Sequence, residues 1–352
     1  MKIVIAIDSF KGSLTSAQAN EAVETAIANV CPEADITTIP VSDGGEGWID
    51  AFVDAKGGKI SFVHAHDPLM RKRTARFLKY GDKAIIESAE VIGLNRIDES
   101  ERNPLKTSSY GLGEIMANAV LQGCTELLVG VGGTATCDCG IGMLRAIDQI
   151  MNGINEEQRE SLPQNVRITV ANDVTNPLYG SNGAAEVFAP QKGADRHMVK
   201  ILDRRARLFA AHNARLMGYD CSMNLGAGAA GGIGYACMQF LDAKMKPGAD
   251  ILLNECQFHQ IINDADIVIT GEGRADAQTL MGKLPYRILQ QAKAQNIPVM
   301  LFAGQVEDKN GLLDAGFEEV VNINQDDTPL HVAMKPDYAI SQLQTAAYNI
   351  FI

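Results

Sequence analysis

The sequence predicts an α/β protein in which a parallel-sheet domain is interrupted by a second, mixed α/β domain. Near both ends of the chain, short and uninterrupted runs of β-branched and apolar residues are typical of parallel strands that are covered on both faces. Each of these runs leads through a loop rich in glycine and charge into a helical pattern. The middle of the chain instead contains short alternating runs, which are typical of antiparallel strands.

The amino-terminal part contains two units of strand, loop and helix. Thr15 and Gln18 have the spacing of a capping box, which predicts where the first helix begins. Gly57 and Gly58 end the second helix. The expected elements are, in order, strand 3–7, loop 8–13, helix 16–30, strand 36–41 and loop 42–47.

In the middle of the chain, the turn at residues 80–83 joins two alternating runs and predicts a β-hairpin. A helix from Gly111 then leads to a strand and a glycine-rich loop, and a long amphipathic helix follows further on. The expected elements are strands 61–66, 74–79, 84–88, 126–131 and 166–171, and a helix from about 197 to 217.

The order of strand, loop and helix returns at residues 266–270. The loop that follows, 270–276, carries three ionisable side chains, and Gly282 and Lys283 precede a helix with Pro285 near its first position. Free N–H groups, the helix dipole and a lysine would then attract phosphate. A charged surface loop after an ordinary turn is the alternative. Strands 298–303 and 319–323 and a helix from about 337 complete the chain.

Together the flanking strands predict a discontinuous Rossmann-like, flavodoxin-like domain formed by residues 1–58 plus 264–352. Residues 59–263 would form the inserted mixed α/β domain. Loops at the carboxyl ends of parallel strands gather where ligands bind, so the loops of the first domain are candidate binding loops.

Composition limits the partners. The chain has 352 residues, a formal net charge of −12 and seven cysteines. Nucleic acid or an anionic membrane would be repelled by this charge. An odd number of cysteines without repeated spacing, and an apolar start that Asp8 interrupts, predict a reduced, cytoplasmic protein. Small molecules are the expected partners, and a homodimer is left open.

Several short motifs have a simpler interpretation than the one they first suggest. Residues 226–231 (GAGAAG) match a dinucleotide-binding fingerprint, but no β-rich run precedes them, so a glycine-rich helix start that packs closely or touches an anion is favoured. His64 and His66 are favoured as ordinary strand residues over metal ligands. Cys137 and Cys139 are interpreted as packed thiols beside a working Asp138. Neither a Walker-type phosphate loop nor a nucleophile elbow is present.

Carboxylates and cations share the glycine loops, and phosphoryl transfer needs this mixture. Acids hold Mg²⁺, cations and N–H groups neutralise the phosphate, and a further acid orients the attacking hydroxyl. The acids are Asp8, Asp43, Glu46, Asp138, Asp173, Glu272 and Asp276, and the cations are Lys11, Lys192, Arg274 and Lys283.

Seven segments, in order, resemble the type I glycerate kinase family: DSFKGS at 8–13, DGGEG at 43–47, GVGGTAT followed by Asp138 at 130–143, NDVTNPLYG at 172–180, FAPQKGA at 188–194, GAGAAGG at 226–232 and VITGEGRADAQTLMGK at 268–283. The resemblance implies ATP-dependent, Mg²⁺-dependent phosphorylation of D-glycerate to 2-phosphoglycerate in the bacterial cytoplasm. It also implies two α/β domains with the site in the cleft between them.

Two departures from the family pattern stand out. Cys137 and Cys139 replace an asparagine and a glycine beside Asp138, and cysteine tolerates a positive φ less well than glycine. Residues 147–165 lack an expected glycine-rich segment, so part of the inserted domain could be rebuilt.

The residue roles are hypotheses. Lys283 and Lys11 are expected to contact phosphate, and Arg274 to clamp either a carboxylate or a phosphate. The candidate catalytic residues are Asp43, Asp138, Asp276 and Lys11. The candidate substrate or phosphate ligands are Ser9, Arg274, Lys283, Glu272, Gly44, Gly45, Gly132, Gly133 and Lys192. The candidate Mg²⁺ ligands are Asp43 and Asp173.

Two other classes stay open. A nucleotide-linked oxidoreductase would also use a Rossmann-like sheet, although GEGRADAQT stands where its glycine fingerprint would be. A binding or regulatory protein could have lost turnover through the changes at Cys137 and Cys139.

Overall fold

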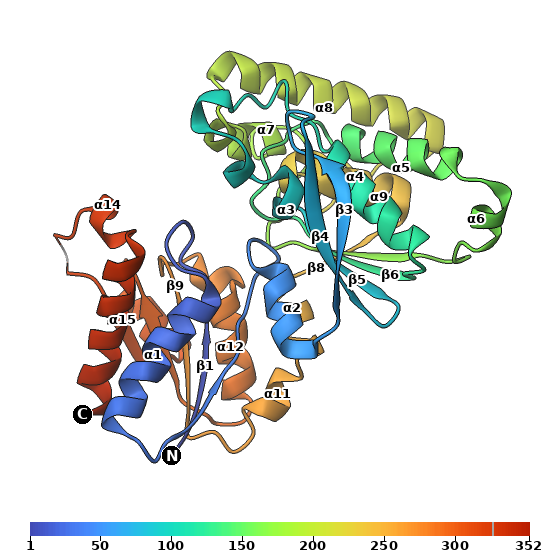
Figure 1. Ribbon diagram of the computed structural model, residues 1–352. Coiled ribbons are helices and arrows are strands. Elements are labelled where there is room, and N and C mark those ends of the chain that lie inside the picture. The colour runs from blue at the N-terminus through green and yellow to red at the C-terminus, as the bar shows by residue number, and fades with distance from the viewer. Residues whose placement is uncertain (326) are drawn as a thin grey trace. The chain divides into compact units, whose positions relative to one another are not determined.

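The structure, a computed structural model, describes residues 1–325 and 327–352 (Figure 1). The chain divides into two compact units. Unit 1 comprises Met1–Asp43, Asp50–Lys56 and Ala249–Ile352, and unit 2 comprises Gly44–Ile49 and Gly57–Gly248. Residues 249–263 therefore belong to unit 1, whereas the sequence-based division places them in the inserted domain. A contact between Arg287 Nε and Asp250 Oδ1 at 3.5 Å is one reason that this segment packs with unit 1.

Unit 1 is built on a five-stranded sheet in which every neighbouring pair is parallel. In order across the sheet, the strands are β11 (Glu319–Asn322), β10 (Val299–Ala303), β9 (Ile267–Glu272), β1 (Lys2–Ile7) and β2 (Asp35–Thr38). Numbered by their order along the chain, they lie as 2-1-3-4-5, which is the flavodoxin-like order. The predicted fold class is therefore confirmed.

Helices cover both faces of this sheet. Side chains of β1 on one face, among them Ile3 and Ile5, pack against α1 (Ser16–Val30) and α15 (Pro336–Phe351), which lie side by side (Figure 1). Thr15 and Gln18 form the predicted capping box at the start of α1. The other helices of unit 1 are most of α2 (Trp48–Lys56), α10 (Gly248–Glu255), α11 (Phe258–Ile261), α12 (Leu284–Lys293), α13 (Lys309–Ala315) and α14 (Leu330–Ala333).

Unit 2 is built on a six-stranded mixed sheet. Its strands, in order, are β3 (Lys59–His66), β4 (Lys72–Tyr80), β5 (Lys83–Glu87), β6 (Glu126–Gly130), β7 (Arg167–Ala171) and β8 (Lys244–Lys246). The first three pair in antiparallel fashion, which includes the predicted hairpin, and the last four pair in parallel fashion. Strand β8 is not among the predicted strands, because the three residues Lys-Met-Lys are too short a pattern to indicate one.

Seven α-helices are described in unit 2. They are α3 (Ala89–Ile92), α4 (Tyr110–Leu121), α5 (Ile141–Gly153), α6 (Glu156–Glu160), α7 (Ala184–Phe188), α8 (Arg196–Met217) and α9 (Ala229–Leu241). The segment 147–165, which lacks the expected glycines, contains the end of α5 and then α6, whose first turn is capped by Asn155. None of the described helices has the length and apolar character needed to span a bilayer.

Candidate active site

In unit 1 the strand order reverses between β1 and β9, and in such sheets the carboxyl ends of the two strands at the reversal flank the ligand-binding crevice. Asp8 follows β1 directly, and its N–H donates to Gly271 O at 2.9 Å. Glu272 is the last residue of β9. The sheet topology therefore brings two carboxylates from opposite ends of the sequence to one edge.

Asp8 is the most perturbed of these acids. Burial raises its pKa well above the usual value of 3.8, and the negative charge of Asp43 raises it further, while the charge of Lys11 lowers it. Lys11 Nζ lies 3.0 Å from Asp43 Oδ2. Ser9 N donates to Asp8 Oδ1 at 2.7 Å, so this loop turns its backbone donor toward the carboxylate.

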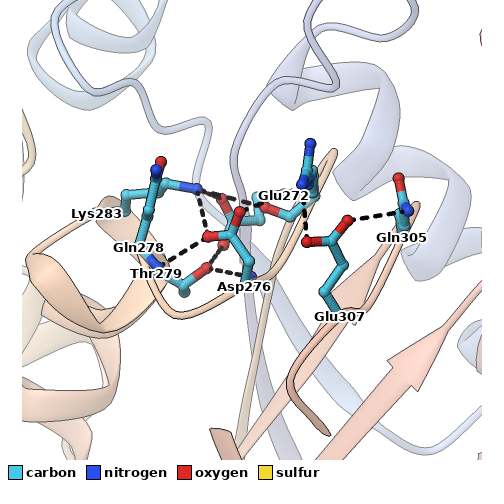
Figure 2. Close-up of polar contacts among 8 residues, drawn as sticks. Glu272, Asp276, Gln278, Thr279, Lys283, Gln305 and Glu307 are labelled. Atoms are coloured by element: carbon cyan, nitrogen blue, oxygen red, sulfur yellow. Dashed lines mark hydrogen bonds and ion pairs between the residues drawn. The ribbon is translucent and has the colours of Figure 1, made fainter. Parts of the chain in front are cut away.

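Glu272 lies at the centre of a network that Figure 2 shows. Its carboxylate accepts hydrogen bonds from Thr279 Oγ1 at 2.6 Å and from Lys283 Nζ at 3.1 Å. Burial raises the pKa of Glu272, and the hydrogen bond from Thr279 and the charge of Lys283 oppose that rise. Asp276 Oδ1 lies 3.7 Å from Lys283 Nζ. The predicted phosphate-binding lysine is therefore held by two acids.

Arg274 extends from the same loop toward Glu307, with Nη2 and Oε2 2.7 Å apart. The loop after β10 runs beside this one: Gln305 N donates to Gly273 O, and Ala275 N donates to Gln305 O. These backbone hydrogen bonds hold the main chain on both sides of Arg274 in place, and the ion pair with Glu307 orients the Arg274 side chain.

Lys283 also stands at the start of α12, where Pro285 lies in the first turn as predicted. The N–H groups expected there from the sequence are largely used: Pro285 has none, Lys283 N donates to Thr279 O at 3.3 Å, and Tyr286 N donates to Lys283 O at 3.1 Å. The helix start therefore contributes mainly the positive potential of its dipole. The arrangement suits a phosphate group.

In unit 2, Asp138 is held at the start of α5 by four donors. Its Oδ2 accepts from Ser109 N at 2.9 Å, from Ser109 Oγ at 2.9 Å and from Gly142 N at 3.1 Å. Its Oδ1 accepts from Gly140 N at 3.1 Å. The carboxylate is thus immobilised in one orientation.

Lys192 is buried, with only 3% of its surface exposed. Its Nζ donates to Thr136 O at 2.8 Å and to Thr134 Oγ1 at 3.2 Å. Burial lowers its pKa, whereas the nearby Cys137 and Asp138 raise it. These two hydrogen bonds anchor Lys192 against the loop that carries Asp138.

The predicted glycines allow close packing of backbones in unit 2. Gly132 N donates to Gly44 O at 3.1 Å, and a Cβ on Gly132 would lie 2.6 Å from Gly45 Cα. Gly133 O accepts from Leu94 N at 2.9 Å. In the GAGAAG segment, Gly231 lies against the loop that carries Asp138, as the closely packed interpretation requires.

The neighbouring thiols and histidine have structural environments. Cys139 adopts a φ of +56°, so this cysteine occupies the left-handed region that favours glycine. Burial raises the pKa of both Cys137 and Cys139, which keeps the thiols neutral. His66 Nδ1 lies 2.9 Å from Glu114 Oε1, so this ring is held by a carboxylate.

The described residues contain no group of three or more His, Cys, Asp or Glu arranged to hold a metal ion. Mg²⁺ in kinases is often held by only one or two carboxylates together with substrate phosphates. Asp8 and Asp43, whose negative charges interact, fit such a partial site because a divalent cation would relieve their repulsion. Asp173 belongs to unit 2, where its Oδ1 accepts from Gly248 N at 3.2 Å.

The structure therefore sorts the predicted residues into two groups. Unit 1 brings together Ser9, Lys11, Asp43, Glu272, Arg274, Asp276 and Lys283, and unit 2 contains Gly44, Gly45, Gly132, Gly133, Asp138, Asp173 and Lys192. Three residues of these networks, Ser109, Thr279 and Glu307, are not among those predicted from the sequence. Thr279 lies inside a quoted motif and could have been found, whereas Ser109 and Glu307 meet their partners only through the fold.

A parallel sheet with acids and cations at its switch point, next to a helix start suited to phosphate, defines the class as enzymes of phosphoryl transfer. A profile described as "Glycerate kinase family" matches residues 3–352. The chain belongs to this family.

Similar proteins cover nearly the full length of the chain. A glycerate kinase from Bacillus subtilis (strain 168) is 38% identical over 371 aligned positions, which cover 99% of this chain and 97% of the relative. A glycerate 2-kinase from Escherichia coli (strain K12) is 37% identical, with 92% and 91% covered. A crystal structure from Salmonella typhimurium LT2, named for glycerate kinase 2, has a TM-score of 0.77 at 35% identity and covers 100% of this chain and 97% of its own.

Proposed function

We propose that the protein transfers the γ-phosphoryl group of ATP to the 2-hydroxyl of D-glycerate, giving 2-phosphoglycerate and ADP. The observation that carries the proposal is the cluster at the switch point of unit 1, in a chain whose full-length relatives include a glycerate 2-kinase. ATP as the phosphoryl donor follows from the family.

Lys283 binds a phosphate oxygen in the positive potential at the start of α12, and Arg274 supplies a planar pair of donors for a second oxygen. An incoming phosphate would compete with Glu272 and Asp276 for Lys283 Nζ, and with Glu307 for Arg274. Exchange of one anion for another keeps each cation neutralised, but the buried Glu272 loses its contact with Lys283, which offsets part of the gain from phosphate binding.

Asp8 and Asp43 would hold Mg²⁺, which in this role neutralises charge on the phosphate oxygens. Lys11 balances the acids when the ion is absent, because its Nζ already contacts Asp43.

During transfer the hydroxyl oxygen of glycerate forms a bond to the γ-phosphorus while the bond from that phosphorus to the bridging oxygen of ADP breaks. The hydroxyl proton passes to a carboxylate, for which Asp138 and Asp43 are the candidates. Asp138 is held in place by Ser109 and by backbone donors, which is the preorganisation that such a group needs.

The test is to incubate the protein with ATP, Mg²⁺ and D-glycerate and to identify the product by ³¹P and ¹H NMR. A phosphate ester on carbon 2, formed in step with ADP, is expected. An ester on carbon 3 would refute the assigned hydroxyl. Absence of any ADP together with saturable glycerate binding would favour a binding protein, and an absorbance change with NAD(H) would favour an oxidoreductase. Loss of turnover with EDTA and its return with added Mg²⁺ test the requirement for the ion.

A further inference from the structure

Unit 2 contains a cavity of about 590 Å³ that is lined by residues of α5, α8 and the segment before α4. All of its lining residues belong to unit 2. Five of them, Cys137, Asp138, Cys139, Ile141 and Gly142, come from the segment 130–143, which is one of the stretches that carry the family resemblance. A cavity of this size is within the range that holds small molecules.

Part of the cavity lining is uncharged. Cys137 and Cys139 line the cavity beside Leu105 and Leu202, and burial raises the pKa of both thiols, so neither contributes a negative charge. These four residues therefore add no negative charge to the cavity, and Asp138 is the carboxylate among the lining residues.

The wall supplies two cations. Arg145 of α5 and Arg205 of α8 both line the cavity, and both residues are exposed. Within residues 1–325 and 327–352, neither guanidinium group has an ion-pair or hydrogen-bond partner. By contrast, Arg207, two residues beyond Arg205, is ion-paired: its Nε lies 2.8 Å from Asp203 Oδ2. Arg145 and Arg205 thus keep their donors available for a ligand.

One polar acceptor also faces this space. Asp138 lines the cavity, and its Oδ1 receives, from the described residues, only the hydrogen bond from Gly140 N. A carboxylate oxygen can accept two hydrogen bonds, so Oδ1 has room for one more donor, such as a ligand hydroxyl.

We propose that this cavity binds the acceptor hydroxy acid: Arg145 and Arg205 receive its carboxylate, and Asp138 Oδ1 accepts a hydrogen bond from one of its hydroxyl groups. The inference rests on the proposed function, because it takes glycerate as the acceptor. Two unpaired guanidinium groups and one oriented carboxylate match an acid that carries both a negative charge and hydroxyl groups. The cavity is larger than a three-carbon acid, and water occupies the remaining volume.

The test compares Arg145→Gln, Arg205→Gln and the double variant with a matched control, Arg204→Gln. Arg204 precedes Arg205 on α8 and is exposed, but it does not line the cavity. Loss of a charge-assisted contact should raise KM for glycerate by about ten- to a hundredfold in each single variant. KM for ATP should stay within about twofold, and Arg204→Gln should match the wild type. Arg145→Lys, which keeps the charge, should recover part of the loss.

A KM for glycerate that stays within about twofold of wild type in the double variant would overturn the proposal. Equal increases in both KM values would also overturn it, because they would indicate nucleotide binding or general damage. Thermal unfolding by circular dichroism identifies any variant that fails to fold, and the Lys substitution then replaces it. If the wild type releases no ADP with glycerate, the proposed function fails by itself. Calorimetric titration with glycerate then tests the cavity separately. Binding to the wild type that is lost in the double variant supports the proposed site. Absence of binding to the wild type, or equal binding to both proteins, refutes it.

Discussion

Replacement of Gly231 by alanine tests how tightly α9 packs against the loop that carries Asp138. Gly231 has a φ of +68°, and an added Cβ would lie 2.0 Å from Thr136 O and 2.7 Å from Cys137 Cα. Both neighbours are backbone atoms, so neither can move aside by rotating a side chain. The backbone of the loop would have to shift.

Two effects contribute to the cost, and a second glycine separates them. Gly218 has a φ of +77°, but nothing lies within 4 Å of the Cβ that alanine would add. Gly218→Ala should therefore lower the free energy of unfolding by only about 1 kcal/mol, the cost of placing an alanine in the left-handed backbone conformation. Gly231→Ala should lower the free energy of unfolding by the same amount and, in addition, by the cost of the atomic overlap. Backbone shifts forced by such an overlap in a packed interior cost about 1–3 kcal/mol.

Equilibrium unfolding in urea, followed by tryptophan fluorescence, measures this difference. Trp48 is the single tryptophan of the chain, it is fully buried, and it belongs to unit 2, as do both glycines. Gly231→Ala should lower the free energy of unfolding by about 1–3 kcal/mol more than Gly218→Ala does. Equal unfolding midpoints and equal slopes for the two variants would refute the close contact between Gly231 and Thr136.

Three further predictions concern the two groups of site residues. Asp138→Asn should lower kcat by about a hundredfold or more while KM for ATP stays near wild type, because only the acceptor side is changed; near-normal turnover would remove Asp138 from the mechanism. Lys283→Met should raise KM for ATP by about ten- to a hundredfold, and unchanged steady-state kinetics would show that the start of α12 binds no phosphate. Asp8 has a pKa raised by burial, so its neutral form stabilises the fold at low pH, and this contribution is lost as pH rises from about 3.8 through the raised value. Urea unfolding in EDTA should therefore show Asp8→Asn gaining stability relative to wild type as pH rises, and a pH-independent difference would contradict the shift.

The sequence was sufficient for the main elements of unit 1. The short apolar runs correspond to β1, β9, β10 and β11, because strands buried on both faces have a composition that can be read directly. Turn and cap positions were also predictable, since Thr15 and Gln18 act within a few residues of each other. The predicted second strand extends to residue 41, whereas β2 ends at Thr38.

Longer-range contacts could not be predicted. Arg274 and Glu307 are 33 residues apart, and Ser109 and Asp138 are 29 apart, so no local pattern links them. A lysine in a loop beside proline and glycine is normally exposed, yet Lys192 is buried because its ammonium group meets Thr134 and Thr136. The roles assigned to these residues stay predictions until the variants are measured.

The pairing of β1 has a consequence for synthesis on the ribosome. Ile3 of β1 lies beside Ile36 of β2 on one side and beside Ile267 of β9 on the other. The chain emerges amino terminus first, so β1 and β2 must wait for β9 to be translated before their sheet can be completed. Almost all of unit 2 emerges during that interval and can fold while the first strands still lack a neighbour. A nascent chain halted near residue 250 would therefore expose an unpaired apolar strand, and this is the stage at which a chaperone would be needed most.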